Sequence, residues 1–533
     1  MAWCASSLRG RPGRRSSPLV PISPANGSRG DIRNTTVSKL LEASPGRVFD
    51  RGKASRRSTM SNATREELLA AREPEGPAPV GVWKLLRGHR EDPLQRWTHV
   101  RDTYGDVARY RYGVGTNYLV THPDGLKRVL QDNAGNYTKR HPTYAMIRRL
   151  VGNGLLTSEG PYWLRQRRLA QPAFHRARIA AMAERMVRAA ERTRDAWEAR
   201  AASGAPFSML EDMSALTLQV VGEALFGTRL AAKTEQVRQA WDTLNAQFVE
   251  RYNRRRFLPP VLPTRSDRAF RAAHRAFFSI VDELVQAKRR EGGAGEDLLS
   301  MLVSARDADT GEAMSDAQLR DEVVTLLLAG HETTALALGW AWALLDQHPR
   351  VAERLRDELA RELQGRSPTF ADLPRLAHTR HVVDEVLRLY PPAYIFFRRV
   401  EADDVVCGAR VRKGGTVVVA PMALHRHPAY WEDPDAFRPE RWADEAAVQR
   451  RPRFAYLPFS AGPRQCIGNT FALTEAVLLL ATLAPRFRPR LVDGYTLRPE
   501  YLTTLRPSGG LPMRLERAAV GAGPRPEESR VVG

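Results

Sequence analysis

The stretch Phe459-Ser-Ala-Gly-Pro-Arg-Gln-Cys-Ile-Gly468 is the most informative part of this 533-residue chain. It places Cys466 in a loop that contains Gly462 and Gly468, directly before an apolar run with helical spacing. The positive end of a helix dipole favours a thiolate over a thiol at such a position. Because glycine has no Cβ atom, we expect the two glycines to let the backbone approach a large flat group closely.

A cysteine thiolate in such a loop is a suitable axial ligand for a heme iron. Five defined positions match the pattern Phe-x-x-Gly-x-Arg-x-Cys-x-Gly, so the segment resembles the heme-binding loop of the cytochrome P450 family. The alternative is a buried free cysteine near a turn. The resemblance implies that the cofactor is heme b (iron protoporphyrin IX) and that Cys466 is its metal ligand. It also implies cofactor contacts from Phe459, Gly462 and Arg464.

A long predicted helix forms the second informative region. Ser315-Asp-Ala-Gln318 has the pattern of a capping box, and the sequence after it can remain helical to about residue 345. At 1.5 Å per residue, such a helix is about 45 Å long. Its apolar composition would also suit a membrane span, but the charge of Glu332 near its centre makes that costly. We therefore expect a buried core helix.

The middle of this helix reads Ala329-Gly-His-Glu-Thr-Thr334. Gly330 opens space on one face, and Thr333 can donate a hydrogen bond to the carbonyl of Ala329, which often bends a helix. The segment resembles the oxygen-pocket motif of P450s. The resemblance implies that Ala329 and Gly330 face the cofactor and that Thr333 and Glu332 are catalytic. Thr333 would hydrogen-bond to bound oxygen, and Glu332 would relay protons.

A charged frame is predicted around the cofactor. Glu385 and Arg388 lie three residues apart on one helix face, and Arg441 follows in Phe437-Arg-Pro-Glu-Arg-Trp442. A Glu-x-x-Arg pair alone is usually a weak surface pair. Together, the segments resemble the P450 Glu-x-x-Arg helix and the Pro-Glu-Arg segment downstream of it. The resemblance implies that the glutamate and both arginines are structural and hold the segment that carries the cysteine loop.

The two carboxylates of a heme need partners, and the planar fork of arginine suits them. The family pattern implies Trp163 and Arg167 on one helix, Arg399 on the strand after Pro391-Pro392, and Arg464. Arg398 competes with Arg399 for the strand position, and the sequence leaves that choice open.

Helical periodicity dominates from about residue 125 to 389, and strand patterns occur at 106–112, 117–121, 394–419 and 495–505. The pattern predicts a mainly α fold with a small β region and a proline-rich break at 258–263. By the resemblance, it is a single large cytochrome P450 domain over residues 60–517, followed by a disordered tail over 518–533.

The net charge of the chain is +22, and residues 1–59 hold 12 basic and 3 acidic residues. Such basicity can indicate nucleic-acid binding. Because the basic residues are mainly arginines spread along the whole chain, we expect no nucleic-acid partner. The composition of residues 1–59 predicts a disordered extension. It is either a transit peptide or, as we favour, part of an over-long gene model that precedes Met60.

The three cysteines argue against a disulfide framework and favour a reducing compartment. The sequence has no hydrophobic N-terminal anchor of the kind found in membrane-bound P450s. We therefore expect a cytoplasmic, monomeric protein without a membrane anchor.

The resemblance implies a bacterial-type heme-thiolate monooxygenase of secondary metabolism that inserts one atom of O2 into a lipophilic substrate. A terpenoid, a fatty acyl chain or a polyketide would suit the apolar residues at the family's substrate positions, Tyr144, Met146, Phe248, Leu326, Ala329, Ala393, Ile395 and Phe396. Electrons would come from a ferredoxin with its reductase or from a flavodoxin-type donor, docked near Arg464. The alternatives are a peroxide-using or isomerising P450, which tends to lose the acid–alcohol pair kept here, and a non-catalytic heme-binding protein.

Overall fold

The computed structural model describes residues 63–79, 92–112, 115–227, 234–255, 265–293 and 295–518. They all belong to the unit Lys53–Gly533. The predicted extension over residues 1–59, the proline-rich break at 258–263 and all but the first residue of the predicted tail over 518–533 lie outside the described residues.

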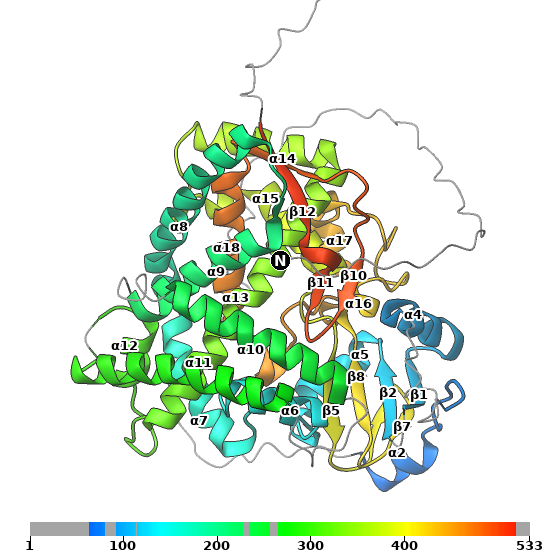
Figure 1. Cartoon of the computed structure of the whole chain (residues 1–533). Helices are drawn as coiled ribbons and strands as arrows, with labels where there is room; N and C mark the ends of the chain where they lie inside the picture. Colours follow the sequence, from blue (N-terminus) through cyan, green and yellow to red (C-terminus); the bar gives the residue numbers. More distant parts are fainter. Residues whose placement is uncertain are drawn as a thin grey trace, which may run out of the picture. The chain divides into compact units, whose positions relative to one another are not determined.

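Helices make up most of the described chain, as the periodicity predicted (Figure 1). The α-helices are α2 (Arg65–Ala70), α4 (Pro93–Tyr104), α5 (Pro123–Lys127), α6 (Pro142–Val151), α7 (Gly160–Ala170), α8 (Arg176–Ser203), α9 (Met209–Phe226), α10 (Thr234–Arg255), α11 (Arg265–Arg290), α12 (Leu298–Ser304), α13 (Asp316–Gln347), α14 (Pro349–Leu363), α15 (Ala377–Leu389), α16 (Pro421–Leu424), α17 (Glu445–Arg450) and α18 (Asn469–Leu483). Shorter 3-10 or π-helical segments are Arg128–Asp132, Ala134–Asn136, Gln171–Phe174, Phe370–Arg375, Pro439–Trp442, Arg453–Ala455, Gly462–Arg464 and Ser508–Gly510.

The strands form small sheets. The largest has the order β1-β2-β8-β5-β3, with the strands β1 (Val107–Tyr112), β2 (Gly115–Val120), β8 (Thr416–Val419), β5 (Phe396–Val400) and β3 (Tyr137–Thr138). The others are β4-β12-β9, β6-β7 and β10-β11, built from β4 (Phe207–Ser208), β12 (Pro512–Arg517), β9 (Phe487–Leu491), β6 (Asp404–Val406), β7 (Ala409–Val411), β10 (Pro499–Tyr501) and β11 (Leu505–Pro507). The predicted strand regions contain β1, β2, β5 to β8 and β10, whereas the sheet β4-β12-β9 was not predicted. Its strand β4 has two residues, which is too short to show a period.

The long helix α13 lies in the core, as predicted. Its N-terminus has the expected capping box, in which the Gln318 N–H donates to Ser315 Oγ at 3.3 Å and the Ser315 N–H donates to Gln318 Oε1 at 2.8 Å. The helix packs against α9, α11, α15 and α18 (Figure 1). By length and composition this helix could cross a membrane, but 72% of its most apolar stretch is buried inside the structure.

Glu385 connects α15 to the chain that precedes the cysteine loop. Arg388 donates to both of its carboxylate oxygens at 2.8 Å, and Arg441 donates to Oε1 at 2.9 Å. Trp442 Nε1 donates to Oε2 at 3.0 Å. Arg388 also donates to three backbone carbonyls between residues 425 and 436. The three residues of the predicted frame therefore meet at one carboxylate.

This group of charges is removed from water, since the side chains of Glu385 and Arg388 are 0% exposed and that of Arg441 is 6% exposed. Burial alone would raise the pKa of Glu385, but the hydrogen bonds and positive charges of Arg388 and Arg441 outweigh it and lower that pKa. A lowered pKa in the folded state stabilises the fold above the ordinary carboxyl pKa, and this contribution is lost as the pH falls through the lowered value.

We expect Glu385→Gln to lower the free energy of unfolding by about 3–5 kcal/mol, because it leaves two buried guanidinium groups without a counter-charge. Urea denaturation followed by circular dichroism measures this change. The control is Glu440→Gln, whose carboxylate is 41% exposed and pairs with Arg354 at 2.6 Å. Breaking such an exposed pair costs less than about 1 kcal/mol. Equal losses in the two variants would contradict the assigned role of Glu385.

Candidate active site

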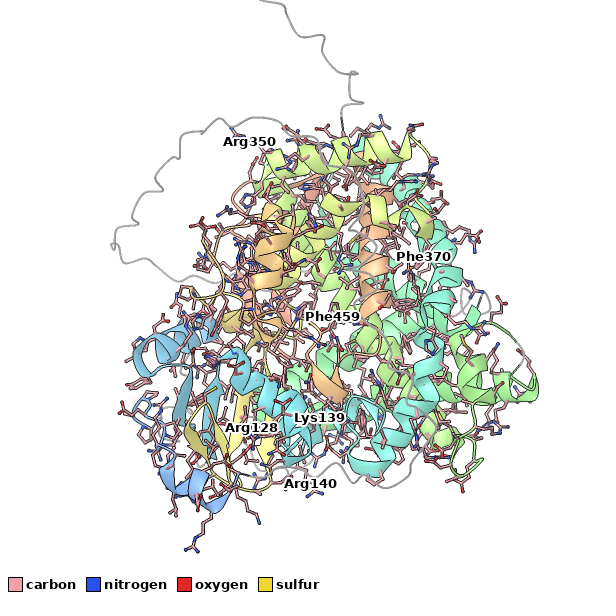
Figure 2. All side chains as sticks on the ribbon, turned by 180° about the vertical axis from the view of Figure 1, so that it is seen from behind. Arg128, Lys139, Arg140, Arg350, Phe370 and Phe459 are labelled. Carbon is pink, nitrogen blue, oxygen red and sulfur yellow. The ribbon has the colours of Figure 1, made fainter. Side chains whose placement is uncertain are left out.

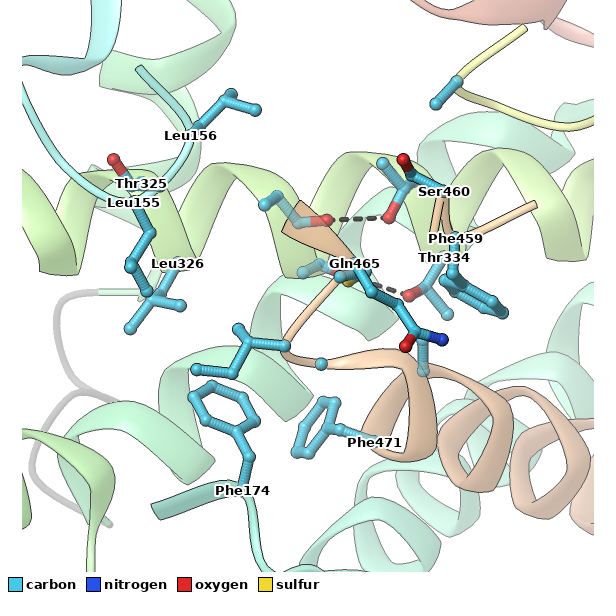
Figure 3. Close-up of a pocket in the computed structure, with 18 of the residues that line it drawn as sticks. Leu155, Leu156, Phe174, Thr325, Leu326, Thr334, Phe459, Ser460, Gln465 and Phe471 are labelled. Carbon is cyan, nitrogen blue, oxygen red and sulfur yellow. Dashed lines mark hydrogen bonds between the residues drawn. The ribbon is translucent and has the colours of Figure 1, made fainter. Parts of the chain in front are cut away.

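The cysteine loop and α13 border a cavity of about 350 Å³, whose other walls include parts of α7, α9, α15, α18 and β5 (Figure 3). The predicted cofactor and substrate residues that line it are Cys466, Trp163, Arg167, Arg464, Phe459, Ala329, Gly330, Thr333, Tyr144, Leu326, Ala393 and Phe396. Six predicted residues, all within the described ranges, do not line it: Gly462, Glu332, Arg399, Met146, Phe248 and Ile395.

The loop presents the Cys466 side chain to the cavity. The Cys466 N–H donates to the Phe459 carbonyl at 3.0 Å, and Gly468 is the N-cap of α18. The thiol is exposed toward the cavity, whereas protein encloses it on its other sides. Burial raises the pKa of the Cys466 thiol, against the lowering effects of the Gly468 N–H and the charge of Arg167. A metal cation bound at the sulfur would act in the opposite direction and favour the thiolate.

Gly462 serves a different purpose from the one expected. Its φ is +68°, a left-handed conformation that favours glycine. A Cβ atom here would lie 1.8 Å from the Leu130 carbonyl oxygen. The glycine thus lets the loop pack against the backbone of residues 130–131, and Gly462 itself does not line the cavity.

The middle of α13 lies across the cavity from the loop. Thr333 Oγ1 donates to the Ala329 carbonyl at 2.7 Å, as predicted, and Thr334 Oγ1 donates to the Gly330 carbonyl at 3.0 Å (Figure 3). A Cβ atom on Gly330 would lie 3.0 Å from Val221 Cγ2, so this glycine also allows α9 to pack closely against α13. The Thr333 hydroxyl is therefore placed at the cavity wall, but its hydrogen is engaged with the helix backbone.

Glu332 points away from the cavity. Its Oε1 accepts hydrogen bonds from Thr504 Oγ1 and Arg506 Nη2, each at 2.8 Å. Both donors belong to the β10–β11 hairpin region, which the sequence did not connect with α13. The structure therefore separates the two predicted catalytic side chains, Thr333 at the cavity and Glu332 in an ion pair outside it.

Basic side chains gather at the end of the cavity near the cysteine loop. Four of the described residues that line the cavity are basic, namely Lys139, Arg167, Arg398 and Arg464, and none of the described lining residues is Asp or Glu. Figure 2 labels Lys139 and Phe459, which line the same cavity, near the middle of the view, and Arg350 near its edge. Burial, followed by the charges of Arg398 and Arg464, lowers the pKa of Lys139 well below its usual value.

The strand arginine at the cavity is Arg398, and the prediction of Arg399 is corrected. Successive residues of a strand point to opposite faces, and the two arginines pair with Val417 and Thr416 of β8. Arg398 is 4% exposed and donates to the Tyr144 hydroxyl at 3.2 Å, whereas Arg399 is exposed to solvent. The sequence shows two adjacent arginines but not the phase of the strand.

Arg464 is also turned inward. It donates to the Ser158 carbonyl at 2.9 Å and to Glu159 at 2.8 Å, and its guanidinium lies 3.7 Å from the centre of the Trp163 ring. Burial lowers the pKa of Arg464 to about 10, with Glu159 opposing this effect. The Arg464 side chain lines the cavity, and its predicted use in docking an electron donor stays a prediction. Arg167 donates to the Gln465 carbonyl at 2.9 Å and so supports the cysteine loop from α7.

The rest of the cavity is largely apolar. Several lining residues were not predicted from the sequence, among them Leu155, Leu156, Phe174, Val221, Leu225 and Phe471. They come from loops or from helix faces that look like ordinary core in the sequence. Of the predicted substrate residues outside the cavity, Phe248 is 2% exposed and belongs to the core, and Met146 and Ile395 pack against that core.

These residues fit a heme. A flat, largely apolar group with two carboxylates would suit the apolar walls and the four lining cations, of which Arg464 also pairs with Glu159 outside the lining, and its metal would face the Cys466 thiol. Of the cations that line the cavity, we expect Lys139, Arg398 and Arg464 to bind the carboxylates.

We expect Arg398→Ala to weaken heme retention by about ten- to hundredfold, because a hydrogen bond to a charged group contributes about 1.5–3 kcal/mol. Transfer of heme to apomyoglobin, followed by absorbance, measures the dissociation rate. The adjacent, exposed Arg399→Ala is the matched control and should leave that rate within about twofold of wild type. A larger effect of Arg399→Ala than of Arg398→Ala would contradict the assignment.

Comparisons with known proteins agree with this geometry. The sequence model of the family described as Cytochrome P450 matches residues 73–511. Cyclooctatin synthase of Streptomyces melanosporofaciens is 40% identical over 430 residues, 80% of this chain and 91% of that protein. Pentalenene oxygenase of Streptomyces avermitilis is 34% identical over 456 residues, 84% of this chain and 98% of that protein. The crystal structure of the cytochrome P450DA heme domain superposes with a TM-score of 0.75 at 29% identity, over 84% of this chain and 99% of that one. The chain belongs to the cytochrome P450 family.

Proposed function

We propose that this P450 monooxygenase hydroxylates a cyclic terpenoid, in the net reaction R–H + O2 + 2e⁻ + 2H⁺ → R–OH + H2O. The observation that carries the proposal is a single cavity in which the Cys466 thiol faces apolar walls and Thr333 of α13. Residues 60–517 would form the catalytic domain, a range that the family match over residues 73–511 supports.

The heme would be held at three kinds of contact. Cys466 would bind the iron, and the cations Lys139, Arg398 and Arg464 would bind the two carboxylates. Apolar side chains such as Phe459 would cover the faces of the ring. When bound, the heme supplies the redox chemistry that activates O2. The protein binds the substrate, excludes water and controls the supply of protons.

Proton supply would depend on two side chains of α13. The Thr333 hydroxyl is bound to the Ala329 carbonyl and can donate into the cavity only after a rotation about χ1. The Glu332 carboxylate is bound to Thr504 and Arg506 and would have to leave them to carry a proton toward Gly330. The hairpin that carries these two partners would therefore affect how often Glu332 reaches the cavity.

The substrate class follows from the lining and from the relatives. Much of the cavity lining is apolar, which suits a hydrocarbon skeleton. It includes Leu155, Leu156, Leu326, Val221 and Phe396. Relatives named Pentalenene oxygenase and Cyclooctat-9-en-7-ol 5-monooxygenase carry terpenoid substrates in their names. These names favour a terpenoid over the fatty acyl and polyketide alternatives.

The proposal extends to the partners and the setting of the enzyme. Electrons would come from a separate ferredoxin with its reductase or from a flavodoxin-type protein, and the enzyme would act as a cytoplasmic monomer. Reconstitution of the purified protein with NADPH, ferredoxin reductase, ferredoxin and a panel of cyclic terpenes tests the function. Product formation with peroxide alone, and none with the electron donors, would contradict it.

We expect Cys466→Ala to remove the carbon monoxide spectrum typical of a cysteine-ligated heme in the reduced protein. The reason is that no other cysteine of the described residues lines the cavity. The control is Cys407→Ala on the β6–β7 turn, which should keep the spectrum. An unchanged spectrum in the Cys466 variant would refute the ligand assignment.

We expect Thr333→Val to lower product formed per NADPH by at least about tenfold and to raise release of hydrogen peroxide. Removal of a hydroxyl that takes part in proton transfer costs on the order of 10²–10⁴ in rate. Liquid chromatography and a peroxidase assay measure product and peroxide on the same sample. In Thr334→Val, the next hydroxyl along the helix is removed, and the ratio of product to NADPH should change by less than about threefold. Equal coupling in the two variants would contradict the role of Thr333.

A further inference from the structure

The loop over residues 152–157, between α6 and α7, forms one wall of the cavity although most of it lies outside. Leu155 and Leu156 line the cavity beside Thr325 and Leu326 of α13 (Figure 3). The loop has no regular secondary structure of its own. Its position therefore depends on contacts with the elements around it.

Two carboxyl groups of α13 hold the N–H side of this loop. The Asn153 N–H donates to Asp321 Oδ2 at 2.7 Å, and the Leu155 N–H donates to Glu322 Oε2 at 3.0 Å. Gly154 permits the close approach, because a Cβ atom there would lie 2.3 Å from Thr325 Oγ1. The loop therefore lies directly against the helix at this end of the cavity.

The carbonyl side of the loop is held by two cations of the cavity. Lys139 Nζ donates to the Leu156 carbonyl at 2.7 Å, and Arg464 Nη1 donates to the Ser158 carbonyl at 2.9 Å. These cations are also placed to bind the carboxylates of the heme. The two leucines thus lie between anchors on α13 and anchors on the cofactor side.

The hydrogen bond that Glu322 accepts from the loop is the Leu155 N–H contact. Glu322 is 0% exposed and does not line the cavity, and its Oε1 has no hydrogen-bond partner among the described residues. Burial raises the pKa of Glu322 to about 8, against the lowering effect of the Leu155 N–H and with a further rise from Asp321. The carboxyl group is therefore mostly neutral at pH 7, so a neutral amide can replace it as an acceptor.

We propose that Asp321 and Glu322 are positioning residues for substrate selectivity, which fix Leu155 and Leu156 as a rigid wall of the cavity. The inference rests on the proposed function, since it assumes that ligands of the heme iron enter this cavity. An apolar ligand that reaches the wall gains from its rigidity, because no ordering of the loop is needed on binding. A small ligand would gain less from the rigid wall, because it has less apolar surface to contact it.

The test uses the heme-loaded, full-length protein and two probes, imidazole and 4-phenylimidazole, titrated by the change in heme absorbance. We expect Glu322→Ala to lower the preference for 4-phenylimidazole over imidazole by about tenfold, because a buried N–H loses its acceptor. Glu322→Gln keeps an acceptor oxygen and should stay within about threefold of wild type. The control Glu312→Ala changes a side chain that is 71% exposed, and its preference should not change.

Amide hydrogen exchange of peptides covering residues 152–158 provides a second measurement. Exchange should be faster in Glu322→Ala than in wild type and unchanged in Glu322→Gln. Gly154→Ala should displace the loop while Glu322 is unchanged, and it should also lower the preference for 4-phenylimidazole. This variant replaces Glu322→Ala in the test if Glu322→Ala does not fold.

Three results would overturn the proposal: an unchanged preference in Glu322→Ala and Gly154→Ala, equal weakening of both probes, or a Glu322→Gln variant as impaired as Glu322→Ala. The proposed function fails separately, if the wild-type protein binds no heme or shows no carbon monoxide spectrum of a cysteine-ligated heme.

Discussion

A buried carboxylate surrounded by donors is the contact on which the cavity depends. Glu385 receives hydrogen bonds from Arg388, Arg441 and Trp442, and Arg388 extends these contacts to three backbone carbonyls of the irregular chain that follows. This chain leads directly into the cysteine loop and has little regular structure of its own. Without a fixed point in the core, such a segment would have no defined position. The ion pairs therefore serve placement more than stability, since buried charge pairs often add little net free energy.

The electrostatics of the cavity define what it can hold. Its described lining has four cations and no acidic residue, and mutual repulsion and burial lower the pKa values of Lys139 and Arg464. Burial also raises the pKa of the Cys466 thiol, with the Gly468 N–H and the charge of Arg167 opposing it. A bound dianionic group with a metal at its centre would offset both effects. Its carboxylates would balance the cations, and its metal would stabilise the Cys466 thiolate. The protein thus holds unfavourable charges that its cofactor would neutralise.

The long helix α13 carries two sets of polar side chains that bear on the cavity. Near its N-terminal end, Asp321 and Glu322 accept hydrogen bonds from the loop over residues 152–157, and near its middle Thr333 lies at the cavity wall while Glu332 is bound outside the cavity. Glu332 is bound to Arg506 on the hairpin region of β10 and β11. The anchors of the loop and the side chains of Thr333 and Glu332 therefore belong to one helix, so a shift of α13 would move all of them together.

The sequence by itself determined the family, the mainly α fold, the loop that carries Cys466, the capping box of α13 and the pair Glu385–Arg388. These features depend on local spacing, which survives folding unchanged, as with Cys466 in its loop and Glu385 one helical turn from Arg388. Only the tertiary structure decided that Arg398 rather than Arg399 faces the cavity, that Gly462 packs on Leu130 and that Glu332 points toward Arg506. The phase of a strand and the neighbours of a loop are set by segments far away in the chain. Local sequence patterns do not predict those contacts, because the contacts form only when the elements pack together.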